Sequence, residues 1–191
     1  TTAISAAVNY SVTVTSPSSG CSAVANVTVG LTTSMSGTYT VGVGGNYTTL
    51  TAAVNDYNTR CISGPIVFSL ISPTYTTGET FPISINKNIY QSTINTLTIK
   101  PATGITATIS GSVSNGFIIR VFGDYVTIDG SNNGSTSRNL NLVNTNTTTP
   151  RVLHIGSNGT TPIQQTVLKN AILTNSEPPV TIIDGFRALE V

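Results

Sequence analysis

Charged residues are scarce in this chain. Only 8% of its 191 residues are Asp, Glu, Lys or Arg, against roughly a quarter in typical soluble domains, and the formal net charge is +1. Lysines and arginines stand singly along the sequence and never in runs. Because nucleic acids are bound by clustered cations, the sequence argues against a nucleic-acid partner. Threonine, serine and asparagine must supply the solubility that charge does not.

Long apolar runs are also lacking. The longest resemble Ile66–Phe68, whereas a transmembrane helix needs about 20 apolar residues. We therefore expect no membrane insertion. No charged segment followed by an apolar core opens the chain at Thr1, so any signal peptide is absent or already removed.

Cysteine is nearly absent. Cys21 and Cys61 are the only two, so at most one internal disulfide can form. In an exported protein this pairing is a reasonable expectation. Two free thiols, or a partner for Cys21 upstream of this sequence, are the alternatives. Neither cysteine belongs to a C-x-x-C pair or has a histidine close in sequence, so no metal site is expected from them.

Two patterns of apolar residues in the first 60 positions predict secondary structure. Tyr10, Val12 and Val14 alternate with polar residues, and a turn-like SPSSG follows, which predicts a β-hairpin over residues 9–29. Further on, the spacing i, i+3, i+4, i+7 indicates one face of a helix near residues 49–58. Its apolar residues are Leu50, Ala53, Val54 and Tyr57. Either Thr48 or Thr49 can serve as its N-cap.

Everything after this helix consists of short strand-like runs separated by Gly, Asn, Ser, Thr and Pro. The runs are 66–70, 83–85, 97–99, 107–109, 117–121, 126–128, 140–142, 152–155 and 167–173. Ile128, Leu142, Ile155 and Leu168 are 14, 13 and 13 residues apart. A β-sandwich would show longer strands and tight hairpins, so this loose repeat favours a stacked solenoid. The helix then lies where a cap on the first coil is needed.

Five segments resemble, in order, exported β-helix proteins of Bacteroidetes. They are GTYTVGVGGNYTTLTAAVNDYN, ISGPIVFSL, NTLTIKPATG, FGDYVTIDGSN and VLKNAILTNS, within residues 37–175. That family is pectin-lyase-like, commonly carries immunoglobulin-like modules and is exported by type IX secretion. The preceding NYSVTVTSPSSGCSAVANVTV resembles the last two strands of such a module.

The resemblance implies an all-β chain, a right-handed parallel β-helix with one short N-terminal capping helix and an N-terminal β-hairpin. We expect residues 1–36 to be the end of an immunoglobulin-like module or an N-terminal cover, and residues 37–191 to be the β-helix. Residues 184–191 resemble no capping element, so we expect the solenoid to be truncated at that end. Cys61 departs from the small residue usual in the family, which leaves its pairing with Cys21 open.

The stretch DYVTIDGSNNGS, residues 124–135, is the most suggestive of chemistry. Asp129 would start an EF-hand-like loop, but the Glu required at its twelfth position is Leu140. A shallow calcium site using Asp124, Asp129 and the neighbouring asparagines is the remaining metal hypothesis. In the plainer interpretation Asp129 ends a strand, and its carboxylate accepts backbone N–H bonds in a turn.

A further hypothesis is a weak ligand-binding or catalytic set on neighbouring coils, formed by Arg120, Asp124, Asp129, Arg151 and His154. The ordinary interpretation of His154 is an outward strand position. Tyr75, Tyr90 and Tyr125 are the candidates for stacking on sugars, in a chain with no Trp and 6% aromatic residues.

The sequence favours a non-enzymatic structural or adhesive segment of a large secreted bacterial surface protein. It would form a stiff rod that contacts other modules of the same polypeptide, extracellular glycans or surface proteins, without a cofactor. The alternative is the N-terminal part of a pectin-lyase-like polysaccharide lyase or hydrolase. We expect the protein to be secreted or exposed at the cell surface.

Overall fold

The computed structural model describes residues 8–30, 33–159 and 162–176. The chain divides into two units, residues 1–33 and residues 34–191. The predicted boundary after residue 36 lies slightly too late, because Met35 already begins a strand of the second unit. Residues 184–191, where a truncated end is expected, lie outside the described residues. No helix in the described part of the chain is long and apolar enough to cross a membrane.

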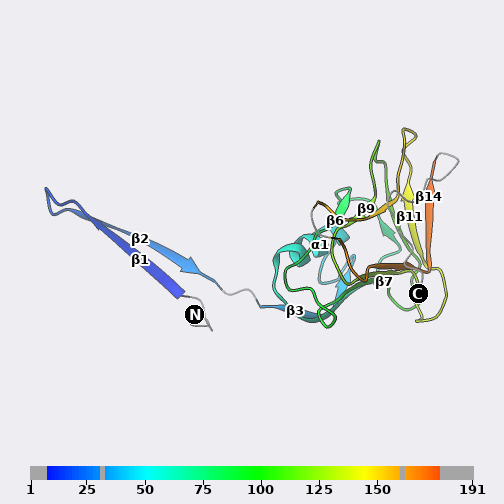
Figure 1. Cartoon of the computed structure of the whole chain (residues 1–191), viewed down its shortest axis with the longest axis horizontal. Helices are drawn as coiled ribbons and strands as arrows, with labels where there is room; N and C mark the ends of the chain where they lie inside the picture. Colours follow the sequence, from blue (N-terminus) through cyan, green and yellow to red (C-terminus); the bar gives the residue numbers. More distant parts are fainter. Residues whose placement is uncertain (1–7, 31–32, 160–161, 177–191) are drawn as a thin grey trace. The chain divides into compact units, whose positions relative to one another are not determined.

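The first unit is an antiparallel hairpin of β1 (Val8–Thr15) and β2 (Ser22–Val29), as predicted (Figure 1). Its turn is closed by the Ser16 N–H, which donates to the Cys21 carbonyl at 2.8 Å. Tyr10, Val12 and Val14 are at least half exposed on one face. A two-stranded ribbon is marginally stable by itself. That this hairpin ends an immunoglobulin-like module stays a prediction.

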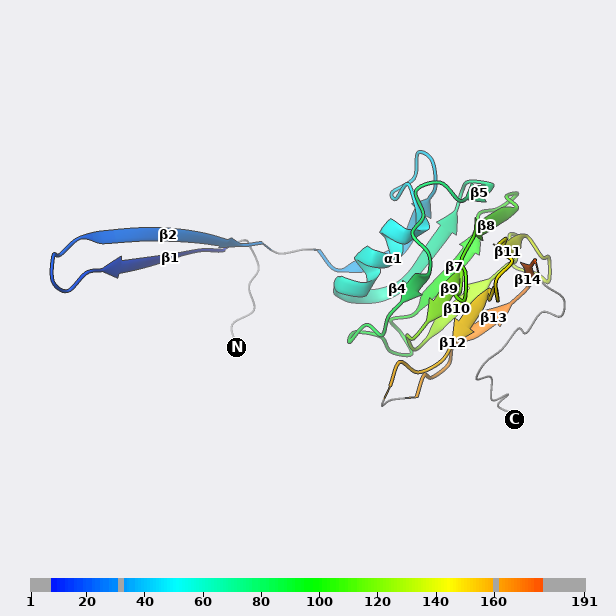
Figure 2. The same cartoon turned by 90° about the horizontal axis from the view of Figure 1, so that it is seen from above.

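The second unit is a parallel β-helix built from three sheets. The first sheet holds β3 (Met35–Val41), β4 (Ile62–Leu70), β7 (Leu97–Pro101), β10 (Val126–Asp129) and β13 (Val167–Lys169). The second holds β5 (Thr74–Tyr75), β8 (Ala107–Gly111), β11 (Leu140–Asn144) and β14 (Ala171–Asn175). The third holds β6 (Ile83–Ile85), β9 (Ile119–Val121) and β12 (Leu153–Ile155). Figure 2 shows β7, β10 and β13 side by side and running in the same direction.

Each coil takes one strand from every sheet in the same order. The coils are β4–β5–β6, β7–β8–β9 and β10–β11–β12, and β13–β14 begins a fourth. Residues paired between successive coils lie 29 to 40 positions apart, as in Leu97 with Val126 and Ile128 with Leu168. The 13- to 14-residue repeat in the sequence is therefore the step from one sheet to the next, and three such steps complete a coil.

The strand predictions were largely confirmed, with three differences. The structure adds β3 and the two-residue strand β5, neither of which was predicted as a strand. The single run predicted over 167–173 is divided into β13 and β14 by Asn170. Asn170 has a φ of +55°, a left-handed conformation that asparagine tolerates and that turns the chain between two sheets.

Apolar side chains fill the inside of the coils, because alternate strand residues point inward. Phe68, Ile99 and Ile128 pair one above another in the first sheet and are at most 1% exposed. Tyr39, Tyr47 and Tyr57 approach the Phe68 ring in edge-on orientations, with centroids 6.1 to 6.4 Å away. The core of the first sheet is therefore aromatic at the first coil and aliphatic in the coils above it.

The single helix among the described residues, α1 (Leu50–Thr59), packs against the first coil. The four residues predicted for its apolar face, Leu50, Ala53, Val54 and Tyr57, are all buried. Thr49 is its N-cap and accepts a hydrogen bond from the Ala52 N–H. Asn58 bonds the outer edge of β6: its amide donates to the Ser84 carbonyl, and its oxygen accepts from the Asn86 N–H. The helix thus covers the core and also pairs backbone groups of an edge strand, as the predicted cap should.

Glu79 completes the start of this helix from a distant loop. Its two carboxylate oxygens accept the N–H groups of Leu50 and Thr51, each at 2.7 Å. The first turn of α1 has no acidic residue of its own. These N–H groups have no partner within the helix. A carboxylate at this position accepts their hydrogen bonds, and its negative charge interacts favourably with the positive end of the helix dipole.

Replacing Glu79 with alanine is expected to lower the free energy of unfolding by about 1 to 2 kcal/mol, since two N–H groups lose a charged acceptor. The measurement is the midpoint of chemical unfolding followed by circular dichroism. Thr77→Ala, at an exposed position in the same loop, is the control and should change little. Equal effects of the two substitutions would show that Glu79 does not anchor the helix.

Candidate functional site

The outward face of the third sheet carries a row of polar residues across three coils. Ser84, Arg120 and His154 are direct partners in successive strands, while their neighbours Ile119 and Leu153 are buried. Side chains alternate across a strand, so Arg120 and His154 point away from the core. The prediction that Arg120 and His154 stand on neighbouring coils is confirmed, as is the outward position of His154.

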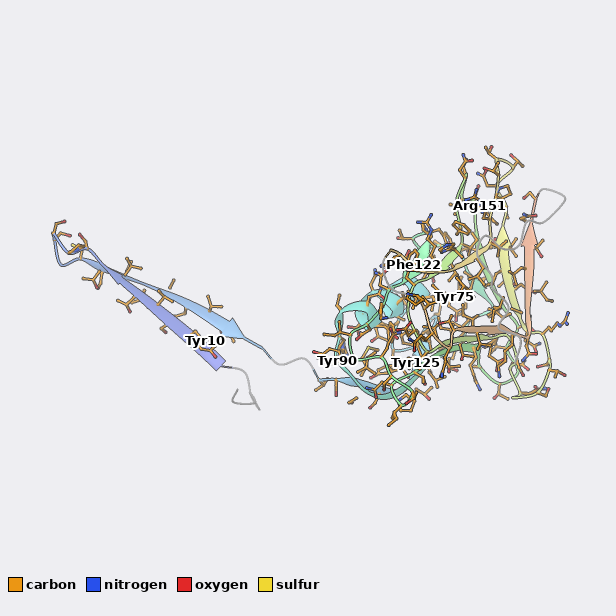
Figure 3. All side chains as sticks on the ribbon, in the orientation of Figure 1. Tyr10, Tyr75, Tyr90, Phe122, Tyr125 and Arg151 are labelled. Atoms are coloured by element: carbon orange, nitrogen blue, oxygen red, sulfur yellow. The ribbon has the colours of Figure 1, made fainter. Side chains whose placement is uncertain are left out.

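Two phenylalanines pack against Arg120 and His154 of this row, and one of them also contacts Arg151. The ring of Phe117 is 7% exposed, and the guanidinium carbons of Arg120 and Arg151 lie over it at 5.2 and 5.4 Å from its centroid. The His154 ring lies between Phe117 and Phe122, with centroid distances of 5.2 and 5.5 Å. We call these five residues the cation cluster. Figure 3 places Arg151 and Phe122 on the same side of the solenoid.

No sequence pattern indicates the role of Phe117, because the strand alternation breaks there. Residues 116–119 are all buried, and the N–H groups of Ile118 and Ile119 both donate to the Val152 carbonyl, at 3.0 and 3.1 Å. This local irregularity has the character of a bulge, which redirects the side chain next to it. Phe117 thereby meets both arginines.

Arg151 reaches the cluster from a loop. Loops 112–116 and 145–151 follow β8 and β11 and extend from the same side of the solenoid (Figure 1). They are stacked: the Asn115 N–H donates to the Thr148 carbonyl at 3.0 Å, and the Arg151 N–H donates to the Gly116 carbonyl at 3.0 Å. Asn115 and Thr149 also share a side-chain hydrogen bond.

The side chain of Asn144, the last residue of β11, forms hydrogen bonds with both loops. It is fully buried, and its amide nitrogen lies within hydrogen-bond distance of the carbonyls of Val113, Gly116 and Arg151, at 2.8 to 3.2 Å. Its oxygen accepts from the N–H groups of Val113 and Asn146. A buried amide with partners on both its oxygen and its nitrogen holds a unique loop conformation, so the backbone of Arg151 is held firmly.

Neither arginine of the cation cluster has a carboxylate partner among the described residues. The ion pairs found there join Arg60 with Asp56, Lys87 with Asp124, and Lys169 with Asp129. Arg120 and Arg151 therefore carry two positive charges that share one aromatic ring. The face of an aromatic ring attracts a cation but does not neutralise it.

Asp124 does not join the cluster. It is 6% exposed, its side chain pairs with Lys87 at 2.7 Å, and it accepts the Gln164 N–H at 2.9 Å. Gln91 donates to its backbone carbonyl at 2.7 Å. These contacts tie three successive connections between the third and first sheets, so the carboxylate has a structural role.

Asp129 stands at the other end of β10. It accepts hydrogen bonds from the Ser131 N–H and the Asn170 amide, and it pairs with Lys169 at 3.3 Å. Partial burial alone would raise the pKa of Asp129, but the hydrogen bonds from Asn170 and Ser131, with Lys169, hold it below its ordinary value. The interpretation of Asp129 as a turn-forming residue is confirmed.

The two carboxylates therefore lie apart, with a strand between them. Strand β10, Val126–Asp129, lies between them and alone spans about 10 Å, and each carboxylate pairs with a different lysine, so the two do not face one metal ion or one scissile bond. The calcium hypothesis that used Asp124 and Asp129 together is not supported by this placement. Across residues 8–30, 33–159 and 162–176, no group of three or more His, Cys, Asp or Glu side chains could hold a metal.

The remaining sequence candidates are dispersed. Cys21 is exposed and Cys61 is half-buried, and both are free thiols in the structure, one in each unit. Their pairing stays a prediction that intact mass before and after reduction would test. A hydrogen bond with the Cys61 side chain raises the pKa of Tyr90, which is 42% exposed.

Of the three tyrosines considered for sugar stacking, Tyr75 was a wrong choice. It is 3% exposed, and its hydroxyl donates to the Val41 carbonyl at 2.6 Å, so it belongs to the core (Figure 3). Tyr125 is half-buried with a φ of +54°. Tyr90, in the loop between β6 and β7, is the most exposed of the three, and no aromatic or cation–π contact joins it to the described residues of the cation cluster.

Comparison with known proteins finds no matching family model, no similar curated protein and no similar solved structure. The function of this chain is therefore inferred from its fold and from the geometry of its side chains.

Proposed function

We propose that this chain is a non-enzymatic structural and adhesive segment of a large secreted bacterial cell-surface protein. The observation that carries the proposal is that many polar side chains form hydrogen bonds from one coil to the next. Its partners would be other modules of the same polypeptide and extracellular glycans or surface proteins.

Amides and hydroxyls link the second and third coils along one side. Asn139 bonds Thr106, Asn141 bonds Thr108, and Asn146 bonds Ser112, with distances of 3.0 to 3.2 Å. Because they add to the backbone ladder between β8 and β11, these bonds resist the separation of coils. A rod built in this way transmits force along its length and exposes few flexible segments to proteases.

The carboxylates of the described residues are used in the same way. Asp56 binds Arg60 and Tyr47, and Glu79 holds the start of α1. Asp124 and Asp129 join successive coils through lysines and amides. An acid–base pair for glycoside hydrolysis needs two carboxylates facing one bond, and these four acids are each committed to a separate structural contact.

Secretion and surface exposure rest on composition and on the segments that resemble exported β-helix proteins. A chain with 8% charged residues and abundant threonine suits a dense β structure in a protease-rich environment. The absence of lysine-rich runs favours protein and sugar partners over nucleic acid.

One observation favours the alternative, a polysaccharide lyase. Arg120, Arg151 and His154 gather on one face, and a lyase needs a base with cations that bind the substrate carboxylate. Against it, the five residues of the cation cluster include no carboxylate to bind a metal, and the ring of His154, the candidate base, is packed against Phe117 and Phe122.

The purified chain is expected to release no unsaturated product from polyuronates, as followed by ultraviolet absorbance, and to resist trypsin throughout residues 34–176. Both follow from a scaffold whose coils are bonded together. Mass spectrometry of the digest reports where cleavage occurs. Early cuts between strands of one coil would refute the rod. Enzyme-dependent product that Arg120→Gln abolishes would establish the lyase.

A further inference from the structure

We propose that the cation cluster binds the sulfate ester of a sulfated glycan. The inference rests on the proposed adhesive function and specifies its ligand. Arg120 and Arg151 would supply the donors, and Phe117, against which the His154 ring also packs, is the platform on which they are arranged.

The three cationic or ionisable groups converge although they come from different parts of the fold. Arg120 lies on β9, His154 on the next coil in β12, and Arg151 in the stacked loop before it. Each lies within 5.4 Å of the Phe117 centroid, so no two are farther apart than twice that distance. Arginine side chains are long enough to close on one oxyanion held between them.

The stacking prepares the guanidiniums for this task. A guanidinium that lies over an aromatic face keeps its N–H groups free at its edge, where they can donate to oxygen. Among the described residues neither Arg120 nor Arg151 has a carboxylate partner, so an arriving anion meets two unneutralised charges. Gathering like charges costs free energy in the empty protein, and an oxyanion between them removes that cost.

The pair of guanidiniums favours a sulfate ester over a carboxylate. One guanidinium edge already satisfies both oxygens of a carboxylate, whereas a sulfate monoester has three terminal oxygens and one permanent negative charge, which two guanidiniums can share. The surroundings favour a sugar as the carrier. Exposed Asn115 and Thr149 beside Arg151, and Ser84 beside Arg120, provide neutral hydroxyl and amide groups of the kind that bind sugar hydroxyls.

The test is calorimetric titration of the untagged full chain with a chondroitin sulfate oligosaccharide and with the same oligosaccharide after chemical desulfation. We expect binding of the sulfated form and at least about tenfold weaker binding of the desulfated form, a loss that corresponds to about 1.4 kcal/mol. The double variant Arg120→Gln/Arg151→Gln should lose a similar factor. Arg138→Gln, an exposed arginine in a different corner, removes one charge and should bind normally.

A second measurement keeps the test valid if the double variant is unstable. His154 is the only histidine of the chain, so its imidazole signals in a proton–carbon NMR spectrum need no assignment. The sulfated ligand should shift them in the wild-type protein, and Arg151→Gln alone, at an exposed loop position, should reduce the shift.

Several outcomes would overturn the site. Equal binding of the desulfated oligosaccharide would assign it to carboxylates, and equal binding of a polyglutamate peptide or of inorganic phosphate would remove the specificity for sulfated sugar. An equal loss of affinity in Arg138→Gln would mean that the oligosaccharide is attracted by the overall positive charge of the protein and not by the cation cluster. If the chain resists trypsin but does not bind the sulfated oligosaccharide, this inference is wrong and the proposed structural role stands. If the chain is cleaved readily by trypsin, the proposed structural role itself is wrong.

Discussion

Gly130→Ala is expected to destabilise the solenoid by about 3 kcal/mol, because two coils meet there backbone against backbone. A Cβ added at Gly130 would overlap the carbonyl oxygen of Asn170 and lie 2.6 Å from its carbonyl carbon. No side-chain rotation relieves a contact between a Cβ and a main-chain carbonyl. Either the corner at Asn170 moves away or the pairing of β10 with β13 is lost.

Chemical unfolding and amide hydrogen exchange would measure this effect in separate ways. Exchange should accelerate most in β13, since the fourth coil is the one displaced. Gly159→Ala is the matched control: a Cβ at Gly159 meets nothing within 4 Å, and its φ is not positive. We expect the control to stay within about 0.5 kcal/mol of the parent. If Gly130→Ala behaved likewise, the close approach of the two coils would be wrong.

The architecture could be predicted from the sequence because its signals are local. Inward apolar residues recur in every short run, and α1 shows its apolar face in four residues at helical spacing. The three steps from Ile128 to Leu168 add up to one coil, which a stacked solenoid requires. Both patterns follow from which face of an element is buried, and burial is what hydrophobic periodicity reports.

Which outward-facing residues become neighbours on adjacent coils could not be predicted in the same way. Coil lengths between 29 and 40 residues mean that the loops, and not a constant repeat, decide which outward residues become neighbours. Arg120 and His154 meet because the connections between them have the right lengths. Asp124 and Asp129 look alike in sequence, yet a strand separates them.

Phe117 and Gly130 illustrate two further limits. Phe117 joins the cation cluster only because the alternation of residues breaks at 116–119, and no local pattern announces such an irregularity. Gly130 looks like an ordinary turn glycine after Asp129. Its true constraint is the carbonyl of Asn170 in the next coil, 40 residues later in the chain.

Asn144→Leu is expected to have the largest effect on stability, about 4 kcal/mol, although leucine has a similar volume. Asn144 is fully buried, and its amide serves three carbonyls and two N–H groups in loops 112–116 and 145–151. Leucine would leave these groups without their partner, and each buried group that stays unpaired costs about 1 to 3 kcal/mol. Part of the loss is recovered where the loops open to water.

The same substitution at Asn141 separates this role from the general effect of asparagine on β11. Asn141 is half-buried and donates one side-chain hydrogen bond, to Thr108 at 3.2 Å, so Asn141→Leu should cost no more than about 1 kcal/mol. Denaturant midpoints compare the two variants, and limited proteolysis should find new cuts in the two loops of Asn144→Leu alone. Since Asn144 also positions the backbone of Arg151, that variant should lose affinity for the sulfated oligosaccharide even at temperatures where it remains folded. If the variant showed no new cuts in the loops and no loss of affinity, the contacts between the two loops would be sufficient to keep their conformation, and the hydrogen bonds of Asn144 would not be needed for it.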